Sequence, residues 1–175
     1  MRLLEVSVIG VALSLVSFAS TQTTITVGSG GGYDFDAIQA AIDAATTGDT
    51  VLVYPGTYYE QVIVRLDVIL RSTDPTSLGI VTSTVIDRSG DGSVIRFQSN
   101  VTEQCVLSGF TIQNGYYGRG GGIHGNSARP VIEHNRIRQN SAVAYTWVSR
   151  PWPDPPYRAP SGLGGGIWNC DGPIR

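Results

Sequence analysis

Short apolar segments recur along the chain at fixed spacings. Residues 105–112 match residues 130–137 at an offset of 25, and residues 120–123 (Gly-Gly-Gly-Ile) match residues 164–167 at an offset of 44. Self-similarity of this kind indicates a solenoid, in which each strand stacks on its equivalent one turn later, about 4.8 Å along the axis. The sequence therefore predicts about four to five turns, each of roughly 20–30 residues.

The composition agrees with a chain made mostly of short strands. Valine and isoleucine together number 33, against 10 leucines, and glycine accounts for 22 of the 175 residues. β-Branched side chains pack well on pleated strands, and glycine suits tight turns. Charged residues make up 15% of the chain and the net charge is −2, which excludes a nucleic-acid binder that works through bulk charge.

One amphipathic helix is predicted near the start of the domain, over residues 36–45. Its apolar face follows the helical period and consists of Ile38, Ala41, Ile42 and Ala45. Asp34 or Asp36 is expected to cap the free backbone N–H groups at the start of the helix. Residues 55–58 (Pro-Gly-Thr-Tyr) predict a turn, and short strands are expected on either side of it.

The N-terminal region resembles a known superfamily. The run Ile25-Thr26-Val27, the predicted helix, and residues 48–60 (Gly-Asp-Thr-Val-Leu-Val-Tyr-Pro-Gly-Thr-Tyr-Tyr-Glu) resemble the cap and first coil of pectin-lyase-like proteins. With the later repeats, the resemblance covers roughly residues 23–175. It implies an all-β fold, a right-handed single-stranded parallel β-helix with an N-terminal capping α-helix. That superfamily contains lyases, hydrolases, esterases, epimerases and non-enzymatic surface proteins, so the resemblance leaves the function open.

The two ends of the chain carry separate expectations. Residues 1–20 are typical of a secretory signal peptide, with Arg2 at the start, an apolar run over residues 6–16, and small residues before the expected cleavage site. The domain is expected over residues 21–175, and its last turn is expected to be truncated because the pattern stops within a strand. The protein is therefore expected to be secreted or at the cell surface, without a further transmembrane segment.

No catalytic residue is identified. Asp87 and Asp91 suit either a small Ca²⁺ loop or a solvated turn, and the turn is the preferred interpretation, so no cofactor or metal is expected. His124-Gly125 departs from the Gly-His-Gly of polygalacturonases because Ile123 precedes it.

Substrate-binding residues are predicted mainly in an insertion at about residues 143–160. Ile112 and Ile123 are 11 residues apart, whereas Ile137 and Ile167, at equivalent positions one turn later, are 30 apart. The insertion and the preceding strand contain the candidate residues Tyr145, Trp147, Trp152, Tyr157, Arg150, Arg136 and Arg138. Flat aromatic rings suit sugar faces, and arginine pairs with acidic groups. Alternatively, the aromatic side chains fold back onto the solenoid, and the arginines only keep a strand soluble.

Two functions from different classes remain. The first is a secreted, non-catalytic protein that binds a polysaccharide or cell-surface glycan, or is displayed at the cell surface. The second is a lyase or hydrolase acting on uronate-containing glycans, with its active site largely in coils beyond residue 175. The scarcity of clustered carboxylates favours the first, because glycoside cleavage uses paired carboxylates.

The two cysteines are predicted to stay unpaired. Cys105 aligns with Pro130, which aligns with Pro173 at an offset of 43, so Cys170 lies about two coils from Cys105. Two coils separate equivalent atoms by about 9.6 Å. A disulfide tolerates no more than about 7 Å between Cα atoms.

Overall fold

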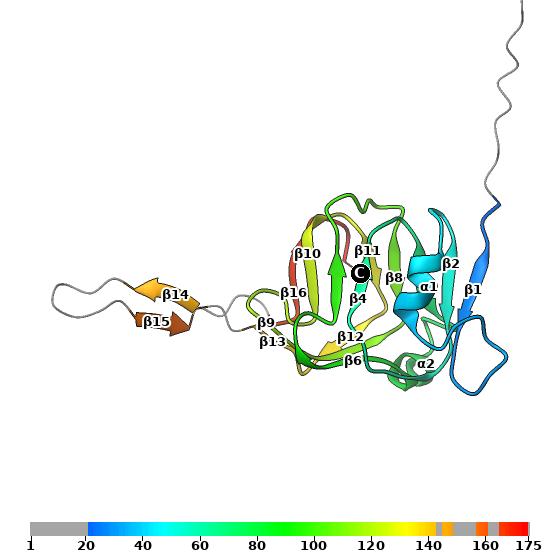
Figure 1. The fold of residues 1–175 in the computed structure, drawn as a ribbon, viewed down its shortest axis with the longest axis horizontal. Helices are drawn as coiled ribbons and strands as arrows, with labels where there is room; N and C mark the ends of the chain where they lie inside the picture. Colours follow the sequence, from blue (N-terminus) through cyan, green and yellow to red (C-terminus); the bar gives the residue numbers. More distant parts are fainter. Residues whose placement is uncertain (1–20, 143–144, 149–156, 161–164, 175) are drawn as a thin grey trace, which may run out of the picture.

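The computed structural model describes residues 21–142, 145–148, 157–160 and 165–174. Most of the strands form three large parallel sheets in a solenoid-like stack (Figure 1). Sheet A contains β1 (Thr24–Val27), β2 (Thr50–Val53), β5 (Ile69–Ser72), β8 (Val106–Ser108) and β11 (Val131–Glu133). Sheet B contains β3 (Gly56–Tyr58), β6 (Thr84–Asp91), β9 (Thr111–Tyr117) and β12 (Arg136–Arg138), with β13 (Ser141–Ala142) beside β9. Sheet C contains β4 (Val62–Val64), β7 (Ile95–Phe97), β10 (Ile123–Ala128) and β16 (Ile167–Cys170).

The chain visits the three sheets in a constant order. It passes from sheet A to sheet B to sheet C through β2, β3 and β4, and repeats this order through β5, β6 and β7. The same order recurs through β8, β9 and β10, and again through β11, β12 and β16. Each turn therefore lays one strand on each of the three sheets, as the sequence repeat predicts.

The strand register confirms two of the three predicted offsets. Val131 pairs with Val106 at an offset of 25, and Ile167 pairs with Ile123 at an offset of 44. The third alignment is wrong by one residue, because Ile174 pairs with Ile132 at an offset of 42. The pairing of β10 with β16 shifts after its first two residue pairs, and this irregularity shortens the offset between the two turns.

The turns differ in length more than predicted. Successive spacings between paired residues of sheet A are 26, 19, 37, 25 and 42, from the pairs Thr24–Thr50, Thr50–Ile69, Ile69–Val106, Val106–Val131 and Ile132–Ile174. Only the spacings of 26 and 25 fall inside the predicted range. A second helix lengthens the 37-residue turn, and the predicted insertion lengthens the last one.

The core lies between the three sheets, because alternate residues of each strand point inward. In sheet C the inward positions are fully buried from one coil to the next at Val62, Ile95 and Ile123. Phe97 and Phe110 are the bulkiest of the fully buried side chains. Equivalent residues stack about 4.8 Å apart, so the core is a continuous column of aliphatic and aromatic side chains.

Asparagine side chains link neighbouring turns at two corners, at Asn135 and Asn140. The Asn135 Oδ1 accepts a hydrogen bond from the Phe110 N–H (2.9 Å), and its Nδ2 donates to the Leu107 carbonyl (2.7 Å). Asn140 repeats the arrangement with the Gly115 N–H and the Ile112 carbonyl. These amides satisfy backbone groups that the strand ladder leaves unpaired where the chain bends.

Helix α1 (Ile38–Ala44) covers the N-terminal end of the core, with Ile38, Ala41 and Ile42 buried (Figure 1). The predicted cap is wrong. The two Glu60 carboxylate oxygens accept hydrogen bonds from the Ile38 and Gln39 backbone N–H groups, both at 2.8 Å.

The aspartates predicted to cap the helix have other roles. Asp34 accepts hydrogen bonds from the Thr26 N–H and hydroxyl, and these bonds lower its pKa. Asp36 makes no side-chain hydrogen bond in the part of the chain that the structure describes. A carboxylate 22 residues away reaches the helix because the next coil brings it there.

A short second helix, α2 (Leu78–Ser83), was not predicted. Its sequence contains a glycine and β-branched residues, which are weak helix formers. It is held by burial of Val81 and by the Thr82 and Thr84 hydroxyl groups, which donate to carbonyls one turn earlier. Neither α2 nor any other helix among the described residues is long and apolar enough to cross a membrane.

Of the turn predicted over residues 55–58, only Pro55 lies in a bend. Residues 56–58 instead form β3, which pairs with β6. Tyr58 is buried, and its hydroxyl donates to the Tyr54 carbonyl at 2.7 Å. The corner therefore lies at Tyr54 and Pro55, and pairing with the next coil extends the chain directly afterwards.

The predicted insertion contains an antiparallel hairpin, β14 (Tyr145–Val148) and β15 (Tyr157–Pro160). In Figure 1 this hairpin lies to one side of the stacked sheets. The insertion thus adds its own small pairing unit between β13 and β16 instead of extending one of the parallel sheets.

Cys105 and Cys170 are both unpaired, as predicted. Cys105 is buried immediately before β8, and Cys170 ends β16, paired in register with Ala128. Burial raises the pKa of each thiol to about 12, so both remain protonated at neutral pH.

We predict that Glu60→Ala lowers the free energy of unfolding by about 0.5–2 kcal/mol, because two N–H groups at the start of α1 lose their acceptor. The matched variant Asp36→Ala removes an exposed carboxylate with no side-chain hydrogen bond and should change stability by less than about 0.5 kcal/mol. Urea unfolding of the two variants measures both values. If Asp36→Ala lowered the free energy of unfolding more than Glu60→Ala does, Asp36 and not Glu60 would be the residue that caps the helix.

Candidate functional site

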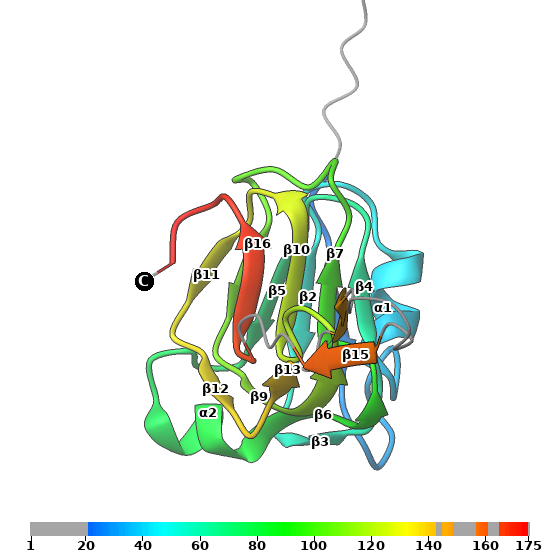
Figure 2. The same cartoon turned by 90° about the vertical axis from the view of Figure 1, so that its left-hand side faces the viewer.

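The outer face of sheet C carries the most concentrated group of functional side chains. One outward position recurs on four neighbouring strands, where Ile63 pairs with Arg96, Arg96 with His124, and His124 with Trp168. Figure 2 shows the four strands side by side in the order β4, β7, β10 and β16. Parallel pairing in register brings an arginine, a histidine and a tryptophan into one row, although 72 residues separate Arg96 from Trp168 (96 to 168).

A hollow of about 560 Å³ lies at the Trp168 end of this row. Strands β9, β10 and β16 and the connection between β9 and β10 supply its lining, which consists of Tyr117, Gly118, Arg119, His124, Asn126, Trp168 and Asn169. We call this feature the sheet C hollow. It combines aromatic rings, two amides and one guanidinium group, and no carboxylate lines it among the residues that the structure describes.

His124 is the centre of the aromatic group. Its ring stacks on the Trp168 ring, with centroids 5.1 Å apart and planes inclined by 27°. The edge-to-face contact with Tyr117 has a centroid distance of 5.7 Å and an interplanar angle of 87°. Only 9% of the His124 surface is exposed, and its Nδ1 atom is buried without a hydrogen-bond partner in the protein. A buried polar atom without a protein partner is uncommon, and a bound water or a ligand atom would satisfy it.

The electrostatic surroundings of His124 favour its neutral form. Burial has the largest effect and lowers its pKa below the usual value of 6.5, and the positive charges of Arg96 and Arg119 lower it further. The Arg119 guanidinium carbon lies 5.2 Å from the centre of the Trp168 ring, in a cation–π contact. At neutral pH the hollow therefore contains an uncharged imidazole, with Arg119 in its lining and Arg96 next to His124 in the strand register.

Glycines allow the backbone to form the hollow. Gly120 has a positive φ of 67°, and a Cβ at this position would lie 2.9 Å from the Trp168 Cβ. A Cβ at Gly122 would lie 2.6 Å from the Gly166 carbonyl oxygen of the next turn. Glycine at positions 120 and 122 is thus a packing requirement, because a side chain at either position would push against the next turn of the chain.

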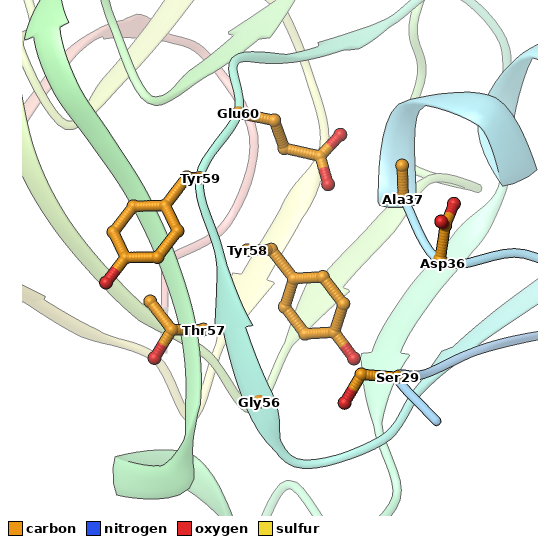
Figure 3. Close-up of a pocket in the computed structure, with 8 residues that line it drawn as sticks. All are labelled: Ser29, Asp36, Ala37, Gly56, Thr57, Tyr58, Tyr59 and Glu60. Carbon is orange, nitrogen blue, oxygen red and sulfur yellow. The ribbon is translucent and has the colours of Figure 1, made fainter. Parts of the chain in front are cut away.

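A second hollow of about 280 Å³, near α1, is structural (Figure 3). It contains two carboxylates, Asp36 and Glu60, together with the Tyr58 and Tyr59 rings. In Figure 3 the Glu60 carboxylate points to the start of the helix, where both of its oxygens accept backbone hydrogen bonds. Since Glu60 is committed to the helix, the two carboxylates do not form a free acid–base pair.

The solvated turn expected at Asp87 and Asp91 is wrong, because both residues lie within β6 and Asp87 is buried. Asp87 accepts hydrogen bonds from the Ser89 N–H and hydroxyl on one oxygen, and from the Gln113 and Asn114 amides on the other. Burial opposes ionisation of Asp87, but these bonds together lower its pKa. Across the described residues, no group of three or more histidine, cysteine, aspartate or glutamate side chains is placed to hold a metal ion.

The predicted binding residues are spread over two regions. Arg136 and Arg138 are exposed on β12 on either side of Ile137, and Arg138 donates to the Gln113 side chain at 2.9 Å. The backbone of Tyr145 and Trp147 lies in β14, and that of Tyr157 lies in β15. Trp152 and Arg150 lie outside the described residues.

Sequence reasoning missed the residues of the sheet C hollow, although a signal was present. The repeated segments align Ile123 with Ile167, so the residues that follow them, His124 and Trp168, must occupy equivalent outward positions. In the sequence, His124 stands out only through its partial match to a catalytic motif, and Trp168 belongs to no recognised motif. Tyr117 and Arg119 gave no periodic signal, because they lie at the end of β9 and in the connection that follows it.

No family model, curated protein or solved structure matches the chain.

We predict that His124 makes stability depend on pH. The unfolded chain takes up a proton on this residue more readily than the folded chain does, because the folded pKa is lowered. The stabilisation associated with neutral His124 is therefore complete above about pH 6.5 and is lost as the pH falls toward the folded pKa.

The variants His124→Asn and His134→Asn separate this effect from that of the carboxylates, since His134 is exposed. Melting temperature measured against pH should fall less steeply below pH 6.5 in His124→Asn than in the wild type. His134→Asn should follow the wild-type curve. Equal slopes in all three proteins would show that His124 is not held neutral by the fold.

Proposed function

We propose that the protein is a secreted, right-handed single-stranded parallel β-helix of the pectin-lyase-like kind that binds carbohydrate without catalysis in this segment. The constant order of strands through three parallel sheets and the helix over one end of the core support the fold. The signal-like pattern of residues 1–20 supports secretion or display at the cell surface.

The observation that carries the binding proposal is the composition of the sheet C hollow. Sugars present flat faces of C–H groups and hydroxyl groups around their edges. The Trp168 and Tyr117 rings offer apolar surface with few rotatable bonds, while the Asn126 amide and the Arg119 guanidinium offer hydrogen bonds. A shallow hollow on the side of a solenoid also leaves room for a polymer to continue past the site in both directions.

The residues predicted in the insertion remain part of the proposal as a second contact. Tyr145, Trp147, Trp152, Tyr157 and Arg150 belong to the segment inserted between β13 and β16, and Trp168 follows on β16. Arg136 and Arg138 lie on β12, in the same turn of the chain. These residues are close to Trp168 along the protein chain. We therefore expect them to be the next contacts of a long glycan that fills the sheet C hollow.

The alternative function is a lyase or hydrolase acting on uronate-containing glycans. A hydrolase needs paired carboxylates, and a Ca²⁺-dependent lyase needs clustered oxygen ligands. In the described part of the chain, the best placed candidates, Glu60 and Asp87, use both carboxylate oxygens in internal hydrogen bonds. Release of reducing ends or unsaturated products from a glycan would favour this alternative over simple binding.

We predict that Trp168→Ala weakens glycan binding by about tenfold or more, equivalent to about 1.4 kcal/mol, because a principal aromatic surface of the hollow is removed. A glycan array screen of the wild-type protein identifies a ligand, and titration calorimetry gives its dissociation constant. Tyr59→Ala is the matched control, because Tyr59 is 73% exposed and belongs to a different hollow.

The double variant Trp147→Ala/Trp152→Ala tests the insertion in the same titration. A smaller but measurable loss of affinity is expected if the insertion extends the site. If glycan affinity fell only in the double variant, the binding site would lie in the insertion and not on sheet C. Absence of any glycan binding by a folded wild-type protein would refute the proposal.

A further inference from the structure

We infer that the sheet C hollow is selective for a glycan that carries a tetrahedral oxyanion, a sulfate or phosphate ester, held between Arg96 and Arg119. This inference rests on the proposed function and names the ligand class for the same site.

The hollow is locally positive in a protein whose net charge is −2. Arg119 lines it, and Arg96 is the register neighbour of His124 on β7. Arg119 contacts the Trp168 ring, which stacks on His124, and the positive charges of both arginines lower the pKa of His124. Among the described residues no carboxylate lines the hollow, so nothing in this part of the chain compensates the charge of the two arginines there.

The two guanidinium groups are also free of internal partners. Among the described residues, Arg65 pairs with Asp43, Arg129 pairs with Glu103, and Arg138 donates to Gln113. Arg96 and Arg119 make no ion pair and donate no side-chain hydrogen bond within the same set of residues. The Arg119 guanidinium carbon lies 5.2 Å from the centre of the Trp168 ring, a cation–π contact that uses none of its five N–H donors as a hydrogen bond.

The number of donors favours a tetrahedral anion over a carboxylate. Each guanidinium presents five N–H donors, whereas a carboxylate has only two oxygens, which a single arginine can occupy in a bidentate pair. A sulfate or phosphate ester has three free oxygens that point in different directions. Two guanidinium groups on different elements, β7 and the β9–β10 connection, can then each engage different oxygens of the same group.

The sugar ring that carries the ester would lie on the aromatic part of the hollow. Trp168 and Tyr117 provide the apolar surface, and Asn126 provides an amide for a ring hydroxyl. The anion therefore gives the charge-dependent part of the affinity, and the rings give a part that depends little on salt.

The test compares matched oligosaccharides that share one backbone and carry a sulfate ester, a phosphate ester, a carboxylate or no charge. The full chain should bind a sulfated or phosphorylated form at least about tenfold more tightly than the neutral form. The preferred ester should also bind more tightly than the carboxylate, and its affinity should fall as ionic strength rises. The two ester arms show which ester the hollow prefers, and inorganic sulfate shows whether the anion binds without the sugar.

Arg96→Gln and Arg119→Gln should each weaken binding of the ester by roughly ten- to a hundredfold, and each should weaken binding of the neutral form by less. Arg96→Lys should restore part of the loss because it restores the charge. Arg71→Gln, which removes an arginine from sheet A, is the matched control and should bind like the wild type. Melting temperatures of all four variants identify any loss that comes from unfolding.

The outcomes separate the two proposals. Equal affinity for the neutral and charged forms, or a carboxylate bound as tightly as the esters, would overturn this inference while leaving glycan binding intact. Ester affinity unchanged in both glutamine variants would also overturn it. If no oligosaccharide binds at all, the proposed function itself fails.

Discussion

Backbone hydrogen bonding between parallel strands of successive turns is the interaction on which the rest of the structure depends. It fixes the distance between turns and, through the register, decides which side chains become neighbours. Val62, Ile95 and Ile123 form one buried column in this way, and Arg96, His124 and Trp168 form one row on the outer face of sheet C. The same pairing requires glycine where two turns approach most closely, as at Gly122 against the Gly166 carbonyl. Core, site and glycine pattern are therefore consequences of one register.

The sequence allowed the repeating part of this arrangement to be predicted. The 25-residue match between the turns that begin with β8 and β11 is visible because each strand repeats apolar residues at the same positions. The face of α1 was also predictable, since Ile38, Ala41 and Ile42 follow the helical period. Local patterns of this kind are reliable when the residues that create them also bury one another.

Features that depend on contact between turns were harder to predict. Nothing near Glu60 in the sequence indicates that it caps a helix that begins at Ile38, because only the coil geometry joins them. Helix α2 is held by Val81 and by hydroxyl groups rather than by helix propensity. The sheet C hollow belongs to the same class, since Tyr117, His124 and Trp168 come from three separate strands. The aromatic insertion can be recognised from its composition alone. The row of Arg96, His124 and Trp168 on sheet C can be recognised only after the strands are aligned.

The sheet C hollow exists only if Arg96, His124 and Trp168 are register neighbours on one face of a parallel sheet. Nuclear Overhauser effects in an isotope-labelled sample test this register most directly, because they detect protons within about 5 Å, close to the spacing of neighbouring strands. The account predicts cross-strand signals between Ile95 and Ile123 and between Ile123 and Ile167, together with signals between the His124 and Trp168 rings. Antiparallel cross-strand signals through residues 105–137, or none between the two rings, would contradict it.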